Sequence, residues 1–167
     1  EQAAKVAYAP EVQLFATDLD ERALHIARQG VYPAATVADI AEERLGRFFT
    51  REDDHVRVKA EVRERVLFAL HNVIKEPPFS RLDLISCRNL LIYLETEAQQ
   101  KILPAFHYAL KPRGFLFLGA SESIGSFSEL FECADKSQRI FSKKPGPTPV
   151  FRLPDSRSHP AANPEIP

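Results

Sequence analysis

Residues 82–87 form an apolar run that follows a loop and ends on Arg88 and Asn89. Pro77 and Pro78 require the loop, because the residue before a proline is biased away from helix. A short apolar run between such boundaries predicts a buried strand. In α/β proteins, ligands bind at the carboxyl ends of the strands. The run therefore predicts an α/β chain and marks Arg88 and Asn89 as candidate functional residues.

Strands and helices are predicted to alternate along the rest of the chain. The apolar runs that predict further strands are residues 12–16, 66–70, 115–118 and 139–142. The runs with helical spacing are residues 20–29, 37–49 and 96–110. Gly30 should end the first helix and Pro104 should break or bend the last, whose end Pro112 and Gly114 mark. The alternation predicts helices on both faces of a sheet.

Residues 50–63 follow a different pattern from the rest of the chain. Four apolar residues alternate there with charged ones, namely Val56, Val58, Ala60 and Val62. A period of two predicts an antiparallel strand with one face in solvent. We therefore expect a hairpin at about residues 50–65 that need not belong to the main sheet.

Composition limits the number of domains and the classes of partner. A chain of 167 residues with 44% hydrophobic residues can bury one core, so we expect one globular domain over residues 1–144. A net charge of −1 gives no general reason to bind nucleic acid. The sequence has no apolar run of about eighteen residues, so we expect a cytoplasmic protein that does not insert into membranes.

Two further features of the composition concern the tail and the cysteines. Seven of the 13 prolines lie within residues 145–167, with few large apolar residues, which predicts a disordered linker. Cys87 and Cys133 lack the spacing of a metal site, so we predict no metal and expect two buried free thiols.

Asp18 and Asn72 stand where predicted strands end. The Asp18 carboxylate is placed to accept both hydroxyls of a ribose, although the same residue, or Asp20, is also suited to cap the following helix. The Asn72 amide and the backbone N–H of Val73 are placed to read an adenine edge, although asparagine is also a common turn residue. Local sequence leaves these alternatives open.

Polar side chains follow two of the predicted strands. The strand at residues 82–87 is followed by Arg88, Asn89 and Tyr93, and the strand at residues 115–118 is followed by Glu122. A surface salt bridge for Arg88 and core packing for Tyr93 are the alternatives to a functional role. Glu122 lies just beyond its strand, and we expect it to be a solvated loop acid.

The segments at residues 15–20, 79–93 and 110–119 resemble the CheR family of chemotaxis receptor methyltransferases. The resemblance runs from about residue 12 to residue 143, and the Cys-Arg-Asn run that ends at Asn89 is its most specific part. It implies an incomplete class I (Rossmann-like) methyltransferase sheet with a small antiparallel β-subdomain as an insertion.

The resemblance also implies roles for named residues. The cofactor would be S-adenosylmethionine, bound by Asp18, Asn72, Val73, Arg88 and Asn89. Arg88 and Tyr93 would be the catalytic residues, and the substrates would be glutamate carboxylates of receptors or sensor proteins. Such a carboxylate is already ionised at pH 7, so alignment and removal of water would suffice for methyl transfer.

The likeness is to the methyltransferase portion of hybrids in which a methylesterase domain precedes it and sensory PAS modules follow. In that family a strand and a glycine-rich loop precede the strand of residues 12–16, and this sequence lacks them. We therefore expect impaired cofactor binding, and either a homodimer or a closed sheet in which residues 12–16 meet residues 82–87. A non-catalytic signalling scaffold is the alternative function, and a methyltransferase of small molecules is a third.

Overall fold

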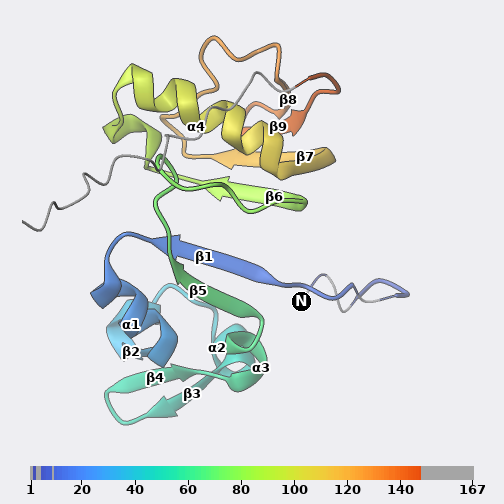
Figure 1. The fold of residues 1–167 in the computed structure, drawn as a ribbon. Helices are drawn as coiled ribbons and strands as arrows, with labels where there is room; N and C mark the ends of the chain where they lie inside the picture. The colour runs from blue at the N-terminus through green and yellow to red at the C-terminus, as the bar shows by residue number, and fades with distance from the viewer. Residues whose placement is uncertain (1, 3–4, 9, 148–167) are drawn as a thin grey trace, which may run out of the picture. The chain divides into compact units, whose positions relative to one another are not determined.

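The computed structural model describes residues 2, 5–8 and 10–147, which form two compact units that meet in sequence at Asn72 and Val73 (Figure 1). The domain boundaries expected from sequence, residues 1–144 and 145–167, stay predictions, and most of the expected linker lies outside the described residues.

One part of the first unit consists of a two-stranded parallel sheet and helix α1 (Glu21–Gln29). Strand β1 (Leu14–Asp18) pairs with β5 (Val66–Leu70), and Asp18 lies opposite Leu70. Helix α1 begins at Asp20, whose carboxylate accepts the N–H groups of Arg22 and Ala23. It ends at Gly30, whose φ of 64° is a left-handed conformation that suits glycine. These elements confirm the predicted strand–helix unit, with the first strand two residues later than expected.

The predicted antiparallel subdomain is present in the first unit as a three-stranded sheet. Strands β2 (Val31–Pro33), β4 (His55–Val58) and β3 (Phe49–Glu52) pair in the order β2-β4-β3. The 3₁₀ helix η2 (Ala34–Val37) and helix α2 (Glu42–Phe48) pack Val37 and Leu45 against Val56.

Two sequence predictions for this subdomain are wrong. Ala60 and Val62 do not continue the strand of Val56 and Val58, because the chain turns at Lys59 into the short helix α3 (Ala60–Arg63). The single helix expected at residues 37–49 is interrupted, because Ala41 has an extended backbone with ψ of 138° and Phe49 begins β3.

The second unit contains a four-stranded sheet in the order β6-β7-β9-β8. Strand β6 (Leu82–Cys87) has the predicted bounds and is parallel to β7 (Leu110–Leu118), while β9 (Ile140–Lys143) and β8 (Phe131–Asp135) are antiparallel. Helix α4 (Thr96–Ala109) continues through Pro104 without a break. Pro112 and Gly114, expected between helix and strand, lie inside β7, and β8 was not predicted.

Helix α4 covers one face of this sheet (Figure 1). Ile102 and Phe106 of α4 belong to the same buried cluster as Leu116 of β7. On the opposite face, Leu84 and Phe115 are paired in register and remain 57% and 43% exposed. Among the described residues of this unit, no helix covers that second face, whereas helices on both faces were expected.

Within the first unit β1 pairs with β5, and within the second unit β6 pairs with β7. The expected closure of the sheet, which would join strands of the two units, stays a prediction. Residues 6–8 form bends rather than a strand.

The two thiols differ in exposure. Cys87, at the end of β6, is buried as predicted, whereas Cys133 is exposed because it lies in β8, at the edge of its sheet. The helices in the described ranges are too short or too polar to cross a membrane.

Candidate functional site

Asp18 lies at the carboxyl edge of the β1–β5 sheet. Its Oδ1 accepts the backbone N–H groups of Leu19 at 2.7 Å and Asp20 at 3.0 Å. Asp20, and not Asp18, caps helix α1. The capping alternative is therefore wrong for Asp18, whose exposed carboxylate is held in one orientation by a local turn. Within the residues that the structure describes, no hydrogen bond occupies its Oδ2.

Asn72 lies at the same edge. The N–H of His71 donates to the backbone oxygen of Asp18 at 3.2 Å, so the chain leaves β5 beside the end of β1 and reaches half-buried Asn72 one residue later. The first unit thus brings Asp18 and Asn72 together, as expected for neighbouring parallel strands. Val73 begins the second unit, where it packs against the buried cluster under α4.

Arg88 directly follows β6 in the second unit. Its guanidinium carbon Cζ lies 4.8 Å from the centre of the Phe117 ring in β7, within the range of a cation–π interaction. Among the described residues no ion pair involves Arg88, so the surface salt bridge that was the alternative to a functional role is not observed. Stacking on Phe117 holds a positive charge near the carboxyl end of β6.

Asn89 and Tyr93 lie in the turn after β6. Asn89 has a φ of 58°, a left-handed conformation that asparagine tolerates better than most residues. Tyr93 ends the 3₁₀ helix η3 (Leu91–Tyr93) and is 79% exposed, so the core-packing alternative is wrong for it.

Glu122 is the polar residue of this edge that sequence analysis misjudged. It is 3% exposed, and its carboxylate accepts four backbone N–H groups. The donors are Gly119 (2.6 Å), Asn89 (2.9 Å), Leu90 (2.8 Å) and Leu91 (2.7 Å). The expected solvated loop acid is therefore a buried anchor. Its signal in the sequence was a glycine directly after a strand with an acid three residues later.

Burial and charge shift two pKa values at this edge. Burial alone would raise the pKa of Glu122, but the backbone N–H donors outweigh burial and hold that pKa below its usual range. Burial, together with the nearby charge of Glu122, raises the pKa of the Cys87 thiol to about 12. Cys87 is therefore a protonated, apolar side chain at neutral pH and not a nucleophile.

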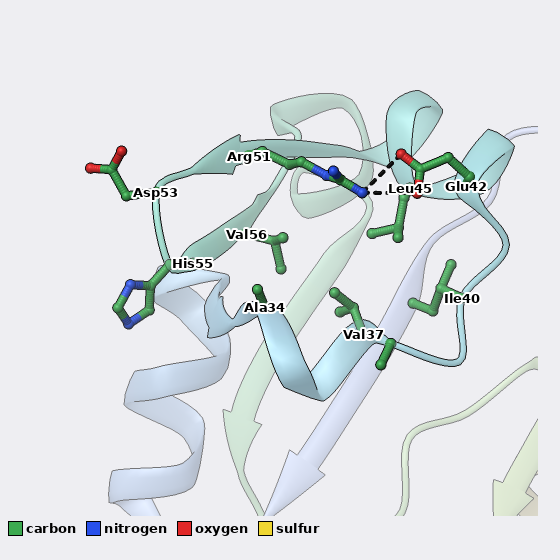
Figure 2. A pocket seen from close by; sticks show the side chains of 10 residues that line it. Ala34, Val37, Ile40, Glu42, Leu45, Arg51, Asp53, His55 and Val56 are labelled. Carbon is green, nitrogen blue, oxygen red and sulfur yellow. Dashed lines mark hydrogen bonds and ion pairs between the residues drawn. The ribbon is translucent and has the colours of Figure 1, made fainter.

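A separate cavity of about 320 Å³ lies in the β-subdomain (Figure 2). Val37, Leu45 and Val56 line it, and Arg51 reaches Glu42 across its rim with two hydrogen bonds of 2.8 Å. None of the site residues predicted from sequence lines this cavity. In the described part of the chain, no group of three or more His, Cys, Asp or Glu side chains is arranged to hold a metal ion.

Known proteins similar to this chain identify its family. The sequence profile described as "CheR methyltransferase, SAM binding domain" matches residues 1–140. The chain is 34% identical over 140 residues to the chemotaxis protein methyltransferase of Escherichia coli, covering 78% of this chain and 48% of that protein. It is 35% identical over 132 residues to chemotaxis protein methyltransferase 1 of Pseudomonas aeruginosa, covering 77% and 48%.

Two further relatives extend the comparison. An uncharacterized 104.1 kDa protein of Rhodobacter capsulatus is 37% identical over 142 residues, which cover 84% of this chain and 15% of that protein. The solved structure of a possible exported protein from Bordetella parapertussis is similar in fold, with a TM-score of 0.50, 15% identity and coverage of 84% and 56%. The chain spans about half the length of the two chemotaxis methyltransferases. On the match over residues 1–140, this chain belongs to the CheR methyltransferase family.

Proposed function

We propose that this chain is part of an S-adenosylmethionine-dependent protein-glutamate O-methyltransferase that acts on chemotaxis-type receptors or sensor proteins in the cytoplasm. The observation that carries the proposal is the family match over residues 1–140, within which polar residues stand at strand carboxyl ends. The relatives named as chemotaxis methyltransferases support the receptor substrate. Family membership further supports a Rossmann-like methyltransferase fold.

The side chains of the first unit suit the nucleoside of S-adenosylmethionine. Two backbone N–H groups fix Oδ1 of Asp18, so the second oxygen is oriented to accept hydrogen bonds from ribose hydroxyls. Asn72, at the same edge, and the N–H of Val73 offer the donor and acceptor that an adenine edge requires. In the second unit, Asn89 is proposed as a further cofactor-binding residue.

The residues after β6 suit a carboxylate substrate. When bound, S-adenosylmethionine would supply an electrophilic methyl group to a glutamate oxygen, with the electron pair of the broken S–C bond left on sulfur. Arg88 attracts and orients a carboxylate while Phe117 holds its guanidinium. Exposed Tyr93 lines the methyl-transfer site and excludes water.

The parent protein is proposed to contain further domains. The match to 15% of a 104.1 kDa relative supports a long, multidomain parent, for which we propose sensory PAS modules as neighbours.

Calorimetric titration of S-adenosylhomocysteine into the full-length protein tests the proposal. Asp18→Asn keeps Oδ1 and the local turn but replaces the oxygen offered to the ribose with an N–H donor. We expect affinity to fall by roughly tenfold or more, as for a lost hydrogen bond to a charged group. Asp39→Asn, a change of another exposed acid in the same unit, is the control and should bind like the wild type. Absence of binding by the wild type would favour a non-catalytic scaffold.

A further inference from the structure

The carboxylate of Glu122 ties together two chain segments that are distant in sequence. Its Oε2 accepts the N–H groups of Gly119 and Asn89, and its Oε1 accepts those of Leu90 and Leu91. Gly119 follows β7 and Asn89–Leu91 follow β6, so one side chain satisfies backbone donors at the ends of two parallel strands. Since these donors would otherwise be unpaired, the arrangement depends on this carboxylate.

The space around the carboxylate admits no larger residue at position 119. A Cβ added to Gly119 would lie 2.6 Å from Oε2 of Glu122 and 2.7 Å from Oδ1 of Asn89. Real Cβ atoms essentially never come so close to other atoms, so the side chains of Glu122 and Asn89 would have to move away from residue 119. Gly119 is therefore required for the contact and not only for a turn.

The contact also holds an unfavourable backbone conformation. Asn89 has a φ of 58°, and its N–H donates to Glu122 at 2.9 Å. A left-handed residue outside glycine persists when the surrounding structure fixes it. Arg88 precedes this residue directly, so the direction in which Arg88 and Asn89 leave β6 depends on the turn that Glu122 holds.

We propose that Glu122 is a positioning residue for methyl transfer, which fixes Arg88 and Asn89 at the end of β6 through the backbone. This inference rests on the proposed function, because it assumes that Arg88 and Asn89 serve the cofactor and the substrate. Glu122 itself is buried, and its carboxylate is bonded to backbone N–H groups.

Glu122→Gln in the full-length protein tests the proposal. Each carboxylate oxygen accepts two N–H groups, so the amide of glutamine must turn its own N–H donors toward one of these pairs. We expect the dissociation constant for S-adenosylhomocysteine, measured per folded molecule, to rise roughly tenfold or more, and kcat to fall. Glu129→Gln, a change of an exposed acid in the same loop region, is the matched control and should change neither.

A purely structural role predicts a different result. In that case Glu122→Gln would lower only the folded fraction, and the folded molecules would bind and react like the wild type. That result would overturn the inference while leaving the proposed function intact. A wild type that binds no S-adenosylhomocysteine would overturn the proposed function, and this inference with it.

Two further measurements keep the test decisive if Glu122→Gln does not fold. Gly119→Ala disturbs the same contact from the other strand and should also weaken binding. Hydrogen exchange of the ligand-free wild type should show the amides of Asn89, Leu90, Leu91 and Gly119 as protected as those within β6. Exchange at the rate of an open loop would overturn the inference.

Discussion

The guanidinium of Arg88 lies over the ring of Phe117, with 4.8 Å between Cζ and the ring centre. The sheet itself thus positions the cation, since Phe117 is part of β7 and pairs in register with Ser86 of β6. A cation–π contact of this kind contributes about 0.5–1 kcal/mol at exposed sites.

Phe117→Leu should lower kcat/KM for receptor methylation by roughly two- to fivefold, the factor that corresponds to the loss of this contact. The substitution keeps an apolar side chain but removes the π-system beneath Arg88. Steady-state kinetics with Phe115→Leu, a change two residues away on the same sheet face, provides the control. Equal losses in the two variants would contradict a role for the contact.

The two thiols should differ in reactivity. Iodoacetamide at pH 8 should label exposed Cys133, while Cys87, buried and with a pKa raised to about 12, should stay unlabelled until the protein unfolds. Peptide mass spectrometry distinguishes the two sites, and denatured protein, in which both react, is the control. Labelling of Cys87 as fast as Cys133 in the native protein would refute the prediction.

Glu122 should make stability depend on acid pH. Folding lowers its pKa below the unfolded value of about 4.3, so the folded state favours the carboxylate. The stabilisation is complete above the unfolded pKa and is lost as the pH falls through the lower folded pKa. Urea unfolding between pH 7 and pH 3 should show a steeper loss of unfolding free energy for the wild type than for Glu122→Gln. Parallel curves would mean that other acids account for the loss.

The chain is expected to form a homodimer in solution. β6 is an edge strand, and Leu84 beside Phe115 exposes an apolar surface of the kind that favours association. Light scattering should give twice the mass of one chain, and Leu84→Lys, which places a charge on this strand, should shift the equilibrium to the monomer. A compact monomer at all concentrations would count against the prediction.

Local signals predicted the elements whose boundaries lie in the sequence itself. Helix α1 has Asp20 and Gly30 as its caps, and β6 stands between a proline pair and Arg88. The signals failed where pairing with distant residues decides the structure. Strand β7 contains Pro112 and Gly114 because its pairing with β6 shifts in register there. No local sequence pattern predicts this shift.

The same division applies to the site. The apolar runs predicted that Asp18 stands at the end of one strand and that Arg88 and Asn89 follow another. The burial of Glu122 did not, because its partners Asn89, Leu90 and Leu91 lie more than thirty residues earlier in the chain. From sequence alone, a carboxylate in a polar loop is expected to be solvated, because the backbone N–H groups that bind it come from a segment distant in sequence.

Asp18 ends β1 and Asp20 caps α1. Sequence alone had left open that Asp18 serves both as the ribose-binding acid and as the helix cap. Asp20 satisfies the first turn of the helix, whereas Asp18 holds only the turn that leaves the strand. Substitutions in this short stretch are therefore separable: a change at Asp20 alters helix stability, and a conservative change at Asp18 leaves the helix cap intact. If Asp18 binds the ribose, as proposed, selection could tune nucleoside affinity at that position without endangering the folding of the helix that follows.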